Sequence, residues 1–223
     1  MSGPVVIPAP RAVEVGGIVN IWDTEAHAAT IYHLARMSDR APAGVGALSR
    51  KLLGPRAIGF VGNGCLVGDG SLSLVNGDYR IGLRRGLPPA REAFAVAHEL
   101  AQWFFRDERD PEIERACDAL AAAILVPRRA FVSVLSAIGE DLPRIAAAFV
   151  ASESCVALRI GEVTGRPVAL LTPMTVTLRG DDWKWPSTEE QIRSLAKKPV
   201  LPGLKRARLT DDARRVVLAA SVA

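Results

Sequence analysis

The chain has 223 residues, of which 49% are hydrophobic and 23% charged, a composition typical of a soluble globular protein. No apolar run reaches the roughly 18 to 20 residues of a membrane span, and the N-terminus lacks a signal-peptide pattern, so we expect a cytoplasmic protein without a membrane partner. The net charge of +4 is mild, and three widely spaced cysteines argue against a disulfide framework.

The first third of the chain predicts a loose lead-in segment, two helices and a sheet. Residues 1–20 are rich in Pro and Gly, and residues 23–38 have the pattern of a helix capped by Asp23. A second, short helix is expected over residues 47–54. Short runs of Val, Ile and Leu between Gly-Asn, Gly-Asp and Asn-Gly turns then predict a small antiparallel sheet of about three strands over residues 57–84.

Helices are predicted from Pro88 to Gly165. The first one starts at Pro88 and runs to about Phe105, and the next one starts after Asp110 and ends before Pro127. We therefore expect one domain over residues 21–165. Residues 166–223 are expected to form an extension that contains strands and ends in a basic tail.

The helix that starts at Pro88 carries the sequence His98-Glu99-Leu100-Ala101-Gln102. This is the zinc-binding motif H-E-x-x-H with its last position changed; in the intact motif two histidines bind zinc and the glutamate activates a water. The rest of the helix is almost entirely apolar, so we expect it to be buried and its polar side chains to need partners or a metal. The alternative is a core histidine that is hydrogen-bonded to a neighbour.

The following helix adds two carboxylates four residues apart, Glu114 and Asp118, on an otherwise apolar helix. A glutamate on a second helix is one standard third ligand for zinc, and a carboxylate one turn further on can accept the free N–H of His98. The alternative is that both carboxylates are exposed and pair with Arg115 or Arg128.

The two stretches "FAVAHELAQWFF" and "ERACDALAAAILVP" together resemble the ImmA/IrrE-type metallopeptidases, and the resemblance extends over roughly residues 45–165. It implies an α+β fold: a zincin-like domain with a small antiparallel sheet and a helical bundle that carries the HExx(Q) helix. It also implies a zinc cofactor, with His98 and Glu114 as ligands, Glu99 as the general base and Asp118 as the group that orients the histidine. Family members cleave regulatory proteins, typically helix-turn-helix repressors, in stress responses or the control of mobile elements.

Gln102 is the departure from the family pattern. A glutamine amide is a far poorer zinc ligand than imidazole. A replacement could come from Asp118 or from His27 or His33, although nothing in the sequence places those two histidines near the site.

Three functions follow from these patterns. The first is a metallopeptidase that hydrolyses a peptide bond in a regulatory, repressor-type protein. The second is a degenerate pseudopeptidase that binds such a protein without cleaving it. The third is direct DNA binding through residues 145–163, which resemble a helix-turn-helix; Glu153 and the scarcity of donors on the second helix argue against it.

Overall fold

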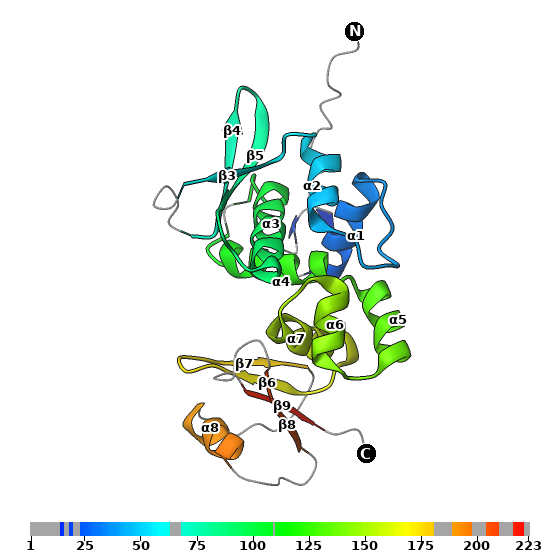
Figure 1. The fold of residues 1–223 in the computed structure, drawn as a ribbon, viewed down its shortest axis with the longest axis vertical. Helices are drawn as coiled ribbons and strands as arrows, with labels where there is room; N and C mark the ends of the chain where they lie inside the picture. The colour runs from blue at the N-terminus through cyan, green and yellow to red at the C-terminus, as the bar shows by residue number, and fades with distance from the viewer. Residues whose placement is uncertain are drawn as a thin grey trace. The chain divides into compact units, whose positions relative to one another are not determined.

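The computed structural model describes residues 14–15, 18–19, 23–62, 68–108, 110–180, 189–197, 204–209 and 216–220 (Figure 1). These residues form an α+β fold, as predicted, with eight helices and small sheets within the described part of the chain. The chain divides into two compact units, residues 1–133 and 134–223. This division falls inside a helix and does not coincide with the expected domain ends at residues 20 and 165, which stay a prediction.

Capping side chains, glycine and proline mark the ends of several helices in the first unit. The Asp23 carboxylate accepts a hydrogen bond from the Ala26 N–H at 3.2 Å and caps the first helix. The second helix ends at Gly54, which has a φ of +96°, and the third has Pro89 in its first turn. The helices of this unit are α1 (Thr24–Leu34), α2 (Val45–Leu53), α3 (Pro89–Phe104), α4 (Ile113–Leu125) and the first part of α5 (Arg128–Ile138).

The prediction of an antiparallel sheet in the first unit was wrong in part, because this sheet is mixed. Its strands are β3 (Ile58–Val61), β4 (Gly70–Val75) and β5 (Asp78–Arg84), in the order β3-β5-β4. The tight turn at Asn76 and Gly77 makes β4 and β5 an antiparallel hairpin, whereas β3 lies on the free edge of β5 and runs parallel to it. Alternating hydrophobicity does not indicate which edge of a hairpin a third strand joins, so the direction of β3 was not predictable.

The hairpin turn requires a positive φ at Gly77, where φ is +85°. We expect Gly77→Ala to lower the free energy of unfolding by about 1–2 kcal/mol, because a Cβ is unfavourable in the left-handed region. Urea unfolding measures this loss. Gly59→Ala is the matched control: its Cβ would meet open space in β3, so an equal loss there would contradict the explanation.

Helices α3 and α4 form the centre of the first unit. They pack against each other, and α1 also packs against α4 through the Tyr32 hydroxyl, which donates to the Ile124 carbonyl at 2.9 Å. Small side chains line the packed faces and allow a close approach of the helices. The buried residues of α3 and α4 include Ala97, Leu100, Ala101, Ala116, Leu120 and Ala121, each fully buried.

The second unit begins within α5 and combines two further core helices with a four-stranded sheet. The Ser152 hydroxyl caps the second of these helices, and Gly165, where the helical region was predicted to end, terminates it with a φ of +72°. Ile192 packs against Ala169 and Leu171 of the sheet. The elements are α6 (Leu142–Phe149), α7 (Glu153–Thr164), α8 (Glu189–Lys197) and the sheet β7-β6-β9-β8, which is formed by Val168–Leu171 (β6), Val176–Arg179 (β7), Leu204–Arg208 (β8) and Val216–Ala220 (β9).

Two short segments complete the description. Within the predicted lead-in of residues 1–20, β1 (Glu14–Val15) and β2 (Ile18–Val19) pair antiparallel, and the other residues of that segment lie outside the described part. Much of the predicted basic tail also lies outside it. Among the described residues no single helix is long and apolar enough to cross a bilayer; α4 and α5, bent by 54°, reach the required length and hydropathy only as a pair.

Candidate metal centre

Helix α3 places His98 and Gln102 one turn apart on the face that meets α4, with Glu99 next to His98 and turned toward the sheet. As predicted, the helix is largely buried, with its apolar residues at most a few per cent exposed on the packed side. The side chain of His98 is 19% exposed and Glu99 is only 5% exposed. Polar groups in such a position need partners, and the structure supplies several from α4.

Asp118 fixes the orientation of the His98 ring. Its Oδ1 atom lies 2.9 Å from His98 Nδ1, so this ring nitrogen carries the hydrogen and donates it to the carboxylate. The hydrogen bond to Asp118 is also the largest cause that raises the pKa of His98, and burial of the ring opposes it. The nearby carboxylates of Glu99 and Glu114 raise the His98 pKa further. Asp118 thus lies where the family resemblance expects a group that orients the histidine.

The second ring nitrogen of His98 faces Gln102 and Glu114. Gln102 Nε2 lies 3.2 Å from His98 Nε2 and 3.4 Å from Glu114 Oε1. Glu114 Oε2 is in turn 3.4 Å from His98 Nε2. The amide nitrogen of Gln102 therefore lies between the two atoms that the resemblance names as zinc ligands.

The two carboxylates of α4 combine features of both interpretations drawn from the sequence. Glu114 and Asp118 have side chains 68% and 63% exposed, as the alternative expected. Their partner is His98, however, and Arg115 pairs with Glu112. Both carboxylates therefore contact His98 across α3 and α4, and their roles as zinc ligand and orienting group stay predictions.

Glu99 is held against the sheet. The Leu72 backbone N–H of β4 hydrogen-bonds to its carboxylate, and a Cβ placed on Gly70 would come within 3.0 Å of Glu99 Oε1. Its other oxygen, Oε2, is buried and has no hydrogen-bond partner within the described part of the chain. Burial raises the pKa of Glu99, which is the direction expected for a carboxylate kept ready to take a proton.

Sequence reasoning missed Gly70 and Leu72. Neither residue carries a side chain with metal-binding or acid–base chemistry, and only the packing of β4 on α3 brings them to Glu99. The glycine at position 70, which begins β4, was the one available signal, because a glycine in a strand often marks a close approach of another group.

The other candidate ligands lie elsewhere or are chemically unsuitable. His27 stacks its ring on Phe104 and Phe105, with centroids 5.2 and 5.3 Å away. Cys117 is buried beside the site, and burial, with the nearby Glu114 and Asp118, raises its pKa to about 12, so it remains a thiol.

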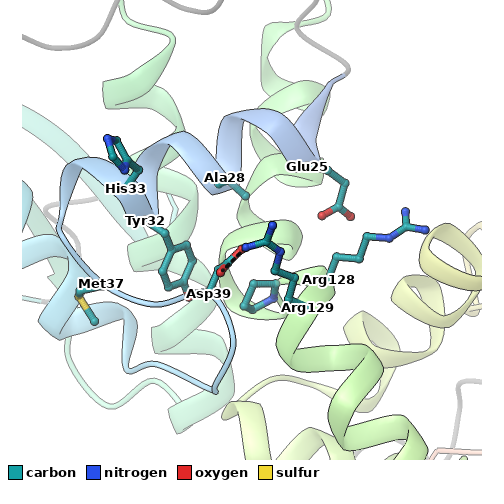
Figure 2. Close-up of a pocket in the computed structure, with 10 residues that line it drawn as sticks. Glu25, Ala28, Tyr32, His33, Met37, Asp39, Arg128 and Arg129 are labelled. Atoms are coloured by element: carbon teal, nitrogen blue, oxygen red, sulfur yellow. Dashed lines mark ion pairs between the residues drawn. The ribbon is translucent and has the colours of Figure 1, made fainter.

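His33 faces a separate cavity of about 360 Å³ between α1, the segment that follows it and the start of α5 (Figure 2). Arg129 points to Asp39 there, with 3.6 Å between the charged atoms. None of the predicted site residues lines this cavity, whose lining consists of Glu25, Ala28, Ala29, Tyr32, His33, Met37, Asp39, Pro127, Arg128 and Arg129.

The residues present do not fit a catalytic zinc site. Such a site uses three protein ligands with available lone pairs, and here the third position presents an amide nitrogen, which has only hydrogens to offer. The described residues also contain no group of three His, Cys, Asp or Glu side chains arranged to hold a metal ion. The misfit follows from the chemistry of Gln102 and from the place of its nitrogen between His98 and Glu114.

Helix α7 does not have the surface of a DNA-recognition helix. Such a helix must expose polar side chains to the major groove. Three polar residues of α7, Glu153, Ser154 and Arg159, are only 5%, 6% and 1% exposed, and Arg159 pairs with Glu162 at 2.9 Å. The α6–α7 pair therefore serves the core of the second unit.

The contact between His98 and Asp118 predicts a pH effect. Because the folded-state pKa of His98 is raised, its contribution to stability is complete below about pH 6.5, the usual histidine value, and is lost as the pH rises through the folded-state pKa. We expect Asp118→Asn to lower the His98 pKa, since the neutral amide removes both the charge and the charge-assisted hydrogen bond. NMR titration of the His98 ring measures this; an unchanged pKa would contradict the assigned cause.

Comparisons with known proteins agree with the motifs. Residues 67–161 match the family described as Peptidase M78, IrrE N-terminal-like domain. A solved structure of a protein named Mycobacterium tuberculosis transcriptional regulator has the same fold, with a TM-score of 0.58 and 13% sequence identity over 89% of this chain and 87% of that chain. A comparison with curated proteins found no match.

The family match contains every predicted site residue, from His98 to Asp118, together with Gly70 and Leu72 of β4. Residues 67–161 of this chain therefore form an IrrE N-terminal-like domain of the M78 family of zincin-like metallopeptidases, the ImmA/IrrE type that the sequence motifs predicted.

Proposed function

We propose that this chain is a pseudopeptidase of the M78 family, which binds a regulatory, repressor-type protein without hydrolysing it. One observation carries the proposal: the Gln102 amide nitrogen lies 3.2 Å from His98 Nε2 and 3.4 Å from Glu114 Oε1, where the family's chemistry requires a third ligand for zinc. An N–H donor at that position cannot act as the third zinc ligand, and hydrolysis in this family depends on the zinc ion.

The choice of a protein partner rests on the family resemblance. Members of the family that the motifs resemble act on a regulatory protein, typically a helix-turn-helix repressor. The other site residues support a partner-binding site that is otherwise intact. His98, Glu99, Glu114 and Asp118 match the residue types of the family motif and lie close to one another. Binding by this chain would withhold the repressor from its own targets.

The test compares the native chain with Gln102→His in cells of the source organism. We expect Gln102→His to generate new protein N-termini in a regulatory protein, and the native chain to co-purify with that same protein in intact form. The double variant Glu99→Gln/Gln102→His is the control, and should bind without cleaving. Cleavage of that protein by the native chain would refute the proposal.

A second function, hydrolysis by the native chain, is favoured by Glu99. This buried carboxylate keeps one oxygen without a partner within the described residues, as a general base would. The same experiment separates the two functions: zinc-dependent cleavage by the native chain that Glu99→Gln abolishes would establish the second and exclude the first.

A further inference from the structure

We propose that the side-chain amide nitrogen of Gln102 takes the place of the metal ion and links α3 to α4 by donating one hydrogen to His98 Nε2 and the other to Glu114 Oε1. The inference rests on the proposed function and deepens it, because it explains how His98 and Glu114 are held in position when no zinc is bound. It can fail while that function stands.

The hydrogen on His98 decides the direction of the first contact. Since His98 Nδ1 donates to Asp118 Oδ1 at 2.9 Å, the other ring nitrogen of the neutral imidazole has a free lone pair. Gln102 Nε2 lies 3.2 Å from that lone pair, and an amide nitrogen can only donate. The contact is therefore an N–H···N hydrogen bond from Gln102 to His98.

The second hydrogen of the same nitrogen meets Glu114. The distance from Gln102 Nε2 to Glu114 Oε1 is 3.4 Å, a long hydrogen bond to a charged acceptor. Glu114 lies in the first turn of α4, whereas His98 and Gln102 are one turn apart on α3. One nitrogen thus contacts an acceptor on each helix, which is what a shared metal ion does in the intact motif.

The same arrangement would compete with an incoming zinc ion. An incoming ion needs the same lone pair of His98 and the same carboxylate of Glu114 that the amide occupies. For Gln102 to become a ligand, its amide must turn so that the oxygen faces the site, and both hydrogen bonds are then lost. Gln102 is in this sense a positioning residue for His98 and Glu114.

The first measurement is hydrogen–deuterium exchange of the backbone amides of α3 and α4 in the full chain, with chelator present. We expect Gln102→Leu, which keeps the bulk but has no donor, to exchange several-fold faster than the native chain near Gln102 and Glu114. Glu114→Leu should give a similar increase, and the double variant should add little to either. Glu114→Gln, which keeps an acceptor oxygen, should remain close to native.

The second measurement uses zinc and NMR. Gln102→His should exchange rapidly in chelator and slow down several-fold when zinc is added, whereas exchange in the native chain should not respond to zinc. In the native chain we expect nuclear Overhauser effects between the side-chain amide hydrogens of Gln102 and the His98 ring. These Overhauser effects report the contact directly, and a general change in stability would not produce them. If Gln102→Leu does not fold, Gln102→Glu replaces it in the exchange experiment.

Two results would overturn the inference: exchange in Gln102→Leu equal to that of the native chain, or absence of the Gln102–His98 Overhauser effects. Either result would leave the proposed function intact, provided that the native chain still binds its partner without cleaving it. Hydrolysis by the native chain would instead remove the proposed function.

Discussion

Gln102→His is expected to raise the affinity of this chain for zinc by more than about 100-fold, because loss of an outer partner alone already costs 10–100-fold and here a direct ligand is restored. Position 102 is one helical turn from His98, so a new imidazole would face the same point as His98 Nε2 and Glu114. Competition with a zinc chelator of known affinity measures the change.

The control for this prediction is the double variant His98→Ala/Gln102→His, in which the gain should disappear. Asp118→Asn in the Gln102→His background should lose part of the gain, because Asp118 holds the His98 ring at 2.9 Å. Equal zinc affinity in the native chain and in Gln102→His would show that the residue at position 102 does not control metal binding.

Leu120→Ala is expected to lower the free energy of unfolding by about 2–5 kcal/mol. Leu120 lies in the middle of α4 and is 0% exposed, so the substitution removes buried apolar contacts and leaves a cavity in the centre of the first unit. Urea unfolding with the intrinsic tryptophan signal measures the loss.

The matched control is Leu74→Ala, the same chemical change at a leucine of β4 that is 63% exposed. A surface substitution of this kind is expected to change the unfolding free energy by less than about 0.5 kcal/mol. A loss at Leu120 as small as the loss at Leu74 would mean that α4 is not a core helix.

The elements that carry the site were predictable because their signals are local. A proline-started apolar helix with His98 and Glu99, followed by a helix with Glu114 and Asp118 four apart, places these four side chains by helical period alone. That the two helices face each other was expected from the two motifs taken together, as parts of one metal site. The structure joins them through His98.

The features of the site that the sequence did not predict depend on contacts between segments far apart in the chain. The backbone of β4 at Gly70 and Leu72 meets Glu99 only through the packing of the sheet on α3. Likewise, Tyr32 ties α1 to α4, yet His27 on the same helix stacks on phenylalanines and does not reach the site. No period or turn in the sequence contains this information.

The hydrogen-bonding role of Gln102 could also not be predicted without the three-dimensional structure. From the sequence it is a lost ligand, a neutral amide where the motif has an imidazole. The distances of 3.2 and 3.4 Å show that its nitrogen faces both remaining ligands, so the change supplies hydrogen bonds at the position from which it removes a ligand. A replacement by alanine would have removed the ligand without supplying them.

The most direct test of the account is the zinc content of the native chain, purified, incubated with a small excess of zinc and freed of unbound ion, beside Gln102→His treated in the same way. The account predicts far less than one zinc per chain for the native protein and about one for the variant. One zinc per native chain, lost in His98→Ala, would contradict it.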